Sequence, residues 1–541
     1  MGKYVRPLPG LLLFAVLFFA SNIQAQAQGD CSERYRSKSF NAIQIFRNVV
    51  YSKNAPKLIA ASLGSETVIG KDLVMDIFMP PPTDTVSGRP VVIIAHGGGF
   101  IDVAFMGGTL LVGTKDNDDV QALCDTFAHW GYVTACIEYR TGFDVASSSS
   151  IKRAVWRGAQ DMSAAIRFFR KNSVWFNIDP DRIFIGGSSA GAFCAIHSTF
   201  ADNNERIPET FQQSIFMADL GAMHSRPVVE LTGFNPFTGN NTAANNVDSL
   251  PTALVSYWGA IADTAFFAGN NKAPMRMFHG TSDPVVSAQC AQPFASVVLA
   301  APICCGSEIM NIALNSRNIP HQLSLEPGQG HEYWGALNGS WQPNSPNNFW
   351  LPIIESTATF FYDYMRPSTP QIVGPSVCAP NTIYNFSITN PQPGSDYCWE
   401  ITSGNIVSAN VNASTIDVIF NSGQIAANVK CSERDKADVL SLQRIKGVNI
   451  GNTVGMEYSA SIENNFKIFP NPTESSFNFE LEDSEIYSGL LIITDLLGKE
   501  LMIIEIDKKI TALSLQNQCS GNYLVRYING KTIQNSILTI R

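Results

Sequence analysis

A serine flanked by glycines is the first candidate for chemistry in this chain. The segment Gly187-Ser188-Ser189-Ala190-Gly191 fits the pattern Gly-x-Ser-x-Gly, which forms a sharp turn between a strand and a helix. Such a turn presents the hydroxyl of Ser189 above the sheet edge, and the helix N-terminus behind it contributes a positive dipole and free N–H groups. Ser189 is therefore the predicted nucleophile, and Ser188 is interpreted as its structural neighbour.

A serine hydroxyl is a weak nucleophile without a base, and one of the seven histidines suits that role. His331 lies in the glycine-rich segment 327–332, just after the last expected strand. Glycines allow a loop to carry a histidine across the sheet edge. The alternative is a loop histidine that faces solvent. It is disfavoured because the chain order serine (Ser189), acid (Asp283), histidine (His331) is one known for nucleophiles in this kind of turn.

Asp283 is the predicted acid that orients the base, since it follows an expected strand at 275–279. A carboxylate in this role fixes the histidine tautomer and stabilises the imidazolium. Asp263 is the runner-up, because no strand directly precedes it. Asp161 is expected to make a structural hydrogen bond from a helix.

A triple-glycine turn, His96-Gly97-Gly98-Gly99-Phe100, follows an apolar run upstream of the serine. Glycines let backbone amides approach a substrate closely, and a developing oxyanion needs such preorganised donors. We expect the N–H groups of Gly98, Gly99 and Ala190 to be these donors and His96 to hold the loop through hydrogen bonds. Two aromatic residues, Phe100 and Trp334, are predicted to line the substrate pocket. The alternative is that they lie in the core, as large aromatic residues more often do.

Strands and helices alternate from about residue 40 to 366 and must position these side chains. This alternation predicts an α/β fold with a mostly parallel sheet covered by helices on both faces. The expected strands are 91–95, 133–137, 181–186, 253–257, 275–279 and 321–325, and the expected helices are 153–169, 190–199, 287–299 and 353–364.

Residues 201–250 interrupt this alternation and are rich in Asn, Thr, Pro and Gly. Long segments of this kind are either functional or irregular. An active-site cap and a surface loop are both compatible with the sequence.

The N-terminus and the composition restrict where the protein works. Residues 1–27 combine a positive start, the apolar run 11–20 and small residues around Ala25 and Ala27, a pattern typical of a secretory signal peptide; a single membrane anchor is the alternative. The net charge of −9 argues against nucleic acid as a partner. The chain has 11 cysteines, an odd number, and either residue of the pair 304–305 is a candidate partner for Cys290.

Taken together, these motifs make residues 28–366 resemble an α/β-hydrolase domain of the carboxylesterase and lipase type with a His-Gly-Gly-Gly loop. The segment 131–140 is similar to the strand that precedes the nucleophile in that family. The resemblance implies ester hydrolysis through an acyl-enzyme, with no metal or cofactor. Relatives of hormone-sensitive lipase usually carry Gly-Asp-Ser-Ala-Gly, and Ser188 departs from that pattern. The variant is closer to esterases that act on acetyl or feruloyl groups of plant polysaccharides and to polyester-cleaving enzymes.

The sequence changes character after two prolines near residue 370. Residues 371–445 show short apolar runs separated by turn residues, which predict a β-sandwich similar to immunoglobulin-like or PKD-like spacers. Residues 466–541 contain the segments 466–473, 495–499 and 520–523, which resemble the C-terminal sorting domain of type IX secretion substrates. This second resemblance implies secretion machinery as a partner and export across the outer membrane, to the medium or the cell surface.

Two other functions are compatible with the same residues. A serine peptidase could use the same fold, although the triple-glycine loop favours esters. A non-catalytic adhesion protein is the second alternative, and it is disfavoured because all three candidate triad positions are filled. The partner predicted for the site is therefore an ester substrate, as a small molecule or within a polymer.

Overall fold

The computed structural model describes residues 33–541, with interruptions. The expected signal peptide at 1–27 lies outside the described residues, as do much of the 201–250 insertion and most of the segment 495–499. The interruptions are 63–64, 103–111, 202–221, 225, 234, 244–246, 296–297, 299, 409, 411, 452–465, 482–488, 496–498, 516–517 and 530–531.

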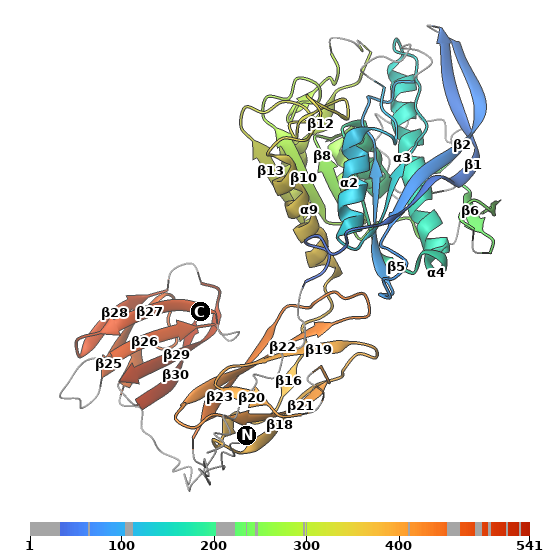
Figure 1. The fold of residues 1–541 in the computed structure, drawn as a ribbon. Coiled ribbons are helices and arrows are strands. Elements are labelled where there is room, and N and C mark those ends of the chain that lie inside the picture. The colour runs from blue at the N-terminus through green and yellow to red at the C-terminus, as the bar shows by residue number, and fades with distance from the viewer. Residues whose placement is uncertain are drawn as a thin grey trace, which may run out of the picture. The chain divides into compact units, whose positions relative to one another are not determined.

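An eight-stranded sheet forms the centre of the first part of the chain (Figure 1), with the strand order β1-β2-β4-β3-β5-β8-β10-β13. The hairpin of β1 and β2 pairs antiparallel with the edge of β4, and the remaining neighbours are parallel. The strand bounds are Gln44–Ser62, Ser65–Met79, Arg89–Ala95 (β3), Val133–Ile137 (β4), Ile178–Ser188 (β5), Ala253–Tyr257 (β8), Met275–Gly280 (β10) and His321–Glu326 (β13).

Two separate apolar cores cover the two faces of this sheet. Helices α3, α5 and α8 pack into one core, and α2 and α9 pack into the other. Strands β3, β4 and β8 are buried along their whole length, as expected for parallel strands covered on both faces. The helix bounds are Asp118–His129 (α2), Ser148–Lys171 (α3), Ser173–Phe176 (α4), Ala190–Phe200 (α5), Ser307–Asn315 (α8) and Trp350–Met365 (α9).

Every strand expected in this part of the chain is present, as are three of the four helices. The helix expected at 287–299 is wrong. Its segment contains the two-residue strand β11 (Cys290–Ala291) and a turn at Pro293 and Phe294, where Phe294 adopts a φ of 49°. A proline inside a helix removes a backbone donor and clashes with the preceding turn, so the apolar spacing of this segment does not produce a helix.

The insertion at 201–250 contributes a small hairpin, β6 (Val228–Leu231) paired with β7 (Gly239–Thr242). Val228 and Val229 are buried in the core that contains α3. Hydrogen bonds from Ser52 and Lys53 to the backbone of Pro227 and Gly239 tie the hairpin to β1. The described part of the insertion is therefore packed against the side of the sheet.

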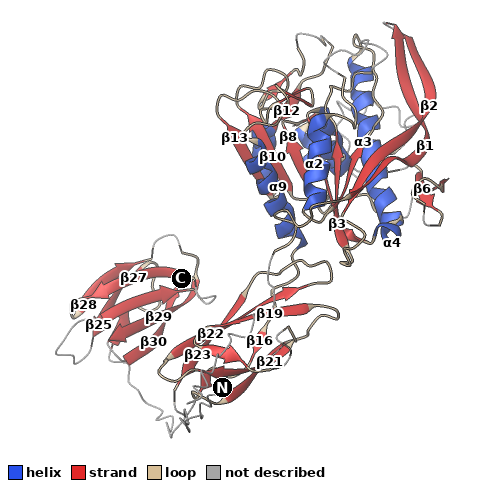
Figure 2. Cartoon of the chain, viewed as in Figure 1, coloured by secondary structure: helices blue, strands red, loops and turns tan. Residues whose placement is uncertain are grey.

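Residues beyond 370 form two β-sandwiches, and the described helices all lie within 118–365 (Figure 2). The first sandwich pairs a sheet of β16-β18-β21-β20 with one of β17-β23-β22-β19, and the second pairs β24-β25-β28 with β27-β26-β29-β30. Their strands are Ile372–Val373 (β16), Val377–Cys378, Ile383–Ile388, Asp396–Ile401, Gly404–Ile406, Thr415–Phe420, Ala426–Arg434 (β22), Arg444–Ile450 (β23), Phe466–Phe469 (β24), Ser476–Leu481, Gly489–Thr494, Glu500–Ile506, Ile510–Ser514, Gly521–Asn529 and Thr532–Ile540 (β30).

The chain divides into two compact units, residues 1–452 and 453–541. The first sandwich thus belongs to the same unit as the eight-stranded sheet. Its β22–β23 connection supplies Ala437 and Val439 to the core around α2 and α9, and the backbone N–H of Leu440 donates to the hydroxyl of Tyr362 on α9 at 2.9 Å. Among the described residues, no helix combines the length and apolar character needed to cross a bilayer.

Candidate active site

The turn between β5 and α5 places Ser189 at the carboxyl edge of the sheet. Ser189 has φ 52° and ψ −116°, a strained conformation for a residue with a side chain. The glycines on either side allow it: a Cβ on Gly187 would lie 2.3 Å from the Gly191 carbonyl carbon, and a Cβ on Gly191 would lie 2.1 Å from the Ala95 oxygen. The Gly-x-Ser-x-Gly spacing is therefore required by backbone contacts within the turn and with β3.

Ser188 is held in place by a neighbouring indole. The Nε1–H of Trp258 donates to the Ser188 hydroxyl at 2.9 Å, and both residues are fully buried. The same indole ring lies edge-on to the imidazole of His331, with centroids 6.3 Å apart. Trp258 thus links the nucleophile turn to the loop that carries His331.

Asp283 precedes strand β13 in the sequence and His331 follows it, and the two side chains are in direct contact. The imidazole Nδ1 of His331 lies 2.7 Å from Asp283 Oδ2. The other carboxylate oxygen of Asp283 accepts the backbone N–H groups of Val285 and Val286 at 2.8 and 2.9 Å. These bonds fix the carboxylate of Asp283, which in turn orients the imidazole of His331.

A second histidine, His279, lies behind this pair. Its Nε2 lies 3.4 Å from Asp283 Oδ2, and its Nδ1 lies 2.8 Å from the hydroxyl of Ser307. Burial alone would raise the pKa of Asp283, but hydrogen bonds from His279 and His331 outweigh it and hold this pKa well below its usual range. Asp283 is consequently ionised, which its predicted role as the acid that orients a histidine requires.

The triple-glycine loop lies directly beside the nucleophile. Gly98 and Gly99 have φ values of 95° and 60°, which favour glycine. A Cβ on Gly98 would lie 2.1 Å from the Gly113 nitrogen, and one on Gly97 would lie 3.6 Å from Ser189 Cβ. The loop is therefore compressed between the backbone of Val112 and Gly113 and the Ser189 turn.

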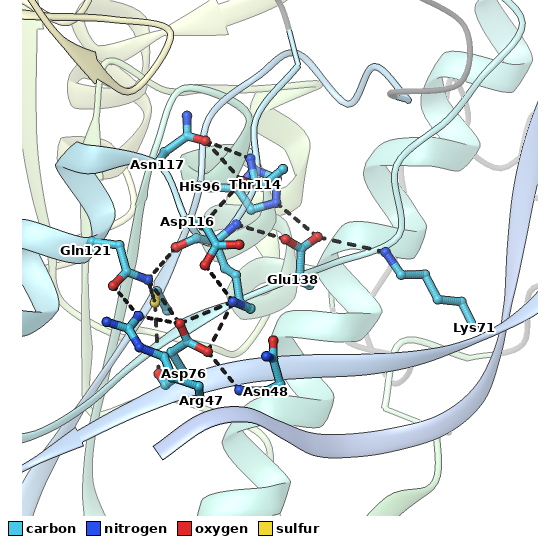
Figure 3. A network of polar contacts seen from close by, with 12 residues as sticks. Arg47, Asn48, Lys71, Asp76, His96, Thr114, Asp116, Asn117, Gln121 and Glu138 are labelled. Atoms are coloured by element: carbon cyan, nitrogen blue, oxygen red, sulfur yellow. Dashed lines mark hydrogen bonds and ion pairs between the residues drawn. The ribbon is translucent and has the colours of Figure 1, made fainter. Parts of the chain in front are cut away.

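A polar network supports this loop from the side of β2 and β4 (Figure 3). The carboxylate of Glu138 accepts a hydrogen bond from the backbone N–H of Lys115 at 2.9 Å. The same carboxylate lies 4.0 Å from Nε2 of the buried His96. Burial lowers the pKa of His96, against the opposing charge of Glu138. The Lys115 ammonium lies 3.1 Å from Asp76. His96 is thus neutral and packed within the network, consistent with its expected supporting role.

Sequence reasoning missed a buried carboxyl pair behind the base. Glu332 follows His331 with a φ of 50°, and its Oε2 accepts the Gly339 N–H at 3.1 Å. The Gly339 carbonyl accepts the Asp119 N–H at 3.0 Å. Burial and the charge of Glu332 raise the pKa of Asp119, and burial raises the pKa of Glu332. No local pattern signals these two buried acids together, because they lie over 200 positions apart in the chain.

An apolar pocket opens beside Ser189. Of the residues predicted to bind substrate, Phe100 lines it together with Gly99, Ser189 and Ala190. Trp334 does not line the pocket, because it is fully buried between Tyr257, Trp258 and Trp350. Trp334 is therefore a core residue and not the pocket residue that the sequence predicts. The remaining lining residues are Phe143, Ile151, Lys152, Val155, Phe193, Ala262, Pro293, Phe294, Val298, Ala301, Pro302 and Cys304.

The other candidates have structural partners. Asp263 accepts the Ala265 N–H at 2.8 Å and caps the short helix Thr264–Ala268. Asp161 is fully buried and bonds the guanidinium and the backbone N–H of Arg140. No group of three or more metal-binding side chains is found within the described part of the chain. The predicted bond of Cys290 is formed with Cys305.

The sheet order, the strand-turn-helix around Ser189 and the loops at its carboxyl edge define an α/β-hydrolase, followed by small all-β domains. Residues 75–298 match the family model described as BD-FAE, and residues 467–540 match that of the secretion system C-terminal sorting domain. The chain therefore carries an α/β-hydrolase domain that is similar to the BD-FAE family and a tail that is similar to secretion system sorting domains.

Individual relatives cover parts of the chain. It is 32% identical to carboxylesterase 3B of Mus musculus over 120 residues, 22% of this chain and 19% of the relative. It is 30% identical to neuroligin-2 of Rattus norvegicus over 139 residues, 25% of this chain and 15% of the relative. The chain thus spans less than a fifth of the length of these curated relatives. Among solved structures, esterase 2 of Thermogutta terrifontis is 17% identical, with 55% of this chain and 90% of that chain covered and a TM-score of 0.36.

Proposed function

We propose that this protein is a secreted serine carboxylic-ester hydrolase in which Ser189, His331 and Asp283 form the catalytic triad. The observation that carries the proposal is the 2.7 Å contact between His331 and Asp283 at the sheet edge where Ser189 is held in its strained turn. Strain of this kind persists where the surrounding structure imposes it and is common at reactive residues.

In the proposed reaction, the Ser189 hydroxyl attacks the ester carbonyl while His331 accepts its proton. The oxyanion of the tetrahedral intermediate is stabilised by the backbone N–H groups of Gly98, Gly99 and Ala190. His331 then donates the proton to the leaving alcohol, which produces an acyl-enzyme on Ser189. A water molecule, activated by the same imidazole, hydrolyses the acyl-enzyme and restores the serine.

The pocket chemistry favours substrates with a short apolar acyl group, on small molecules or on ester-bearing polymers. Aromatic rings of Phe100, Phe143, Phe193 and Phe294 occupy much of its lining, and rings of this size leave little room for long chains. Acetyl and feruloyl esters of polysaccharides and polyesters are the substrate classes to compare. The sorting tail is proposed to bring the enzyme to these polymers by engaging the secretion machinery.

The proposal is tested by replacing the nucleophile. Ser189→Ala is expected to lower kcat for p-nitrophenyl acetate by about 10³-fold or more and to abolish labelling by a fluorophosphonate. Ser188→Ala is the matched control, because its hydroxyl is occupied by Trp258; it should still label. Retained labelling and turnover in Ser189→Ala would reject the assignment, and faster cleavage of a matched peptide than of the ester would favour a peptidase.

A further inference from the structure

One wall of the pocket comes from a single short segment that is closed by a disulfide. The bond joins Cys290 to Cys305, and the residues between them include Pro293, Phe294 and Cys304, all of which line the pocket. The strand β12 (Cys304–Gly306) pairs with β11 on one side and with β9 (Ala260–Ile261) on the other. We call the described residues of this stretch (290–295, 298 and 300–305) the wall segment; it is anchored at its base to the body of the domain.

Phe294 of the wall segment packs against Gly99, one of the predicted oxyanion donors. A Cβ on Gly99 would lie 3.0 Å from the Cζ of Phe294, so the phenyl ring packs on the bare face of this glycine. The backbone of Phe294 has a φ of 49°. Its N–H donates to the Val285 carbonyl at 3.0 Å and its carbonyl accepts the Val298 N–H at 2.9 Å. These bonds direct the ring into the pocket.

The pocket contacts Ser189 together with Gly99 and Ala190. In the proposed reaction the acyl group stays bonded to Ser189 through both steps, whereas the alcohol leaves after the first step. A pocket that touches Ser189 and two of the predicted donors suits the group that remains bonded to Ser189. A ring placed over Gly99 limits how far that group extends.

We propose that Phe294 is a specificity-determining residue that restricts the acyl group to short chains, and that the Cys290–Cys305 disulfide holds it in this position. The proposal rests on the proposed function, because it concerns the same site. It goes further by assigning acyl selection to one side chain and to a covalent anchor outside the triad.

The test compares two series of esters on the full chain. One series varies the acyl group from acetate to octanoate on p-nitrophenol, and the other varies the alcohol of acetate esters. Phe294→Ala is expected to raise the octanoate-to-acetate ratio of kcat/KM by about tenfold or more, the scale on which pocket methylenes discriminate, and to leave the ranking of alcohols unchanged. Phe237→Ala, at an exposed ring on the β6–β7 turn, is the matched control and should leave both series unchanged.

The anchor is tested with the double variant Cys290→Ser/Cys305→Ser, which avoids leaving a single thiol beside Cys304. Its octanoate-to-acetate ratio should move in the same direction as that of Phe294→Ala, by a smaller factor. Two results in Phe294→Ala overturn the acyl assignment: an unchanged octanoate-to-acetate ratio, or an effect on the alcohol series in place of the acyl series. In both cases Ser189 is still labelled by the fluorophosphonate, so the proposed function is not affected. An unchanged ratio in the double variant overturns the anchoring role. Absence of labelling in the wild-type protein overturns the proposed function itself.

Discussion

The nucleophile turn and the wall segment line the same pocket, yet different forces hold them. The turn at 187–191 is enclosed by backbone atoms, so that a Cβ on either of its glycines would lie within 2.5 Å of a neighbouring main chain. The wall segment is held by a disulfide, by two short strand pairings and by the packing of Phe294 on Gly99. The nucleophile turn is held by close main-chain contacts at both of its glycines. The wall segment is held mainly at its base, by the disulfide and the strand pairings.

In the proposed reaction, this difference separates the chemistry from the selection of substrate. The reacting groups must stay within a narrow geometry, and the crowded turn suits that requirement. Selection needs side chains that can be exchanged without moving those groups, and the proposed role of Phe294 gives that part to the wall segment. The comparison predicts large losses of activity or stability from substitutions at the nucleophile turn and at Asp283. It predicts smaller losses from substitutions in the wall segment.

The largest effect is expected from Asp283→Asn, which keeps the shape of the acid and removes its charge. The imidazole of His331 would then lose the carboxylate that fixes its tautomer, and kcat should fall by about 10³-fold to 10⁴-fold. Steady-state hydrolysis of p-nitrophenyl acetate measures the loss. Asp263→Asn is the control, since that side chain caps a short helix; equal losses in the two variants would contradict the assignment.

Crowding at the nucleophile turn is tested by Gly191→Ala. The added Cβ would lie 2.1 Å from the Ala95 oxygen, so we expect either failure to fold or a loss of about 4 kcal/mol in the free energy of unfolding. Gly330→Ala is the control, because its Cβ would meet only Pro284 at 3.9 Å. Similar urea midpoints for both variants would show that the turn is less crowded than described.

Acid should weaken the helix behind the nucleophile. His197 on α5 is buried, its Nδ1 lies 2.8 Å from the Phe193 carbonyl, and its Nε2 accepts the Ala262 N–H at 3.1 Å. Burial lowers the pKa of His197 from 6.5 to about 4. The unfolded chain therefore binds the proton first, and stability present above pH 6.5 is lost as the pH falls toward 4, by up to about 3 kcal/mol.

Urea unfolding at a series of pH values measures this loss. His197→Gln should flatten the pH dependence in that window, whereas His129→Gln, at a partly exposed side chain, should retain it. A wild-type unfolding free energy that stays constant between these pH values would contradict the prediction.

The smallest effect is expected at the wall segment. Cys290→Ser/Cys305→Ser should lower the free energy of unfolding by about 2 kcal/mol and preserve fluorophosphonate labelling of Ser189. Cys519→Ser, at an exposed thiol in the tail, should change it by less than about 0.5 kcal/mol. Loss of labelling in the double variant would mean that the wall segment supports catalysis as well as selection, which would remove the distinction between the two regions.

The same contrast explains what could be predicted from the sequence. The turn at 187–191 and the strands β3, β5 and β10 follow from local patterns, because buried parallel strands and glycine-bounded turns leave a signature in adjacent residues. The apolar spacing at 287–299 predicts a helix, but Pro293 and the Cys290–Cys305 bond override that spacing. Contacts between distant residues, such as the hydrogen bond from Asp119 to Gly339, leave no local signal.

The β22–β23 connection determines where the chain can be shortened. Ala437 and Val439 fill part of the core beneath α2 and α9, Leu440 bonds Tyr362, and the Tyr35 hydroxyl donates to the Ala437 carbonyl at 2.5 Å. A protease that cut at the prolines near 370 and released the first sandwich would uncover apolar surface on the hydrolase. A chain that ends at residue 451 would keep both partners of that core together, because Ala437, Val439 and Leu440 all precede that point.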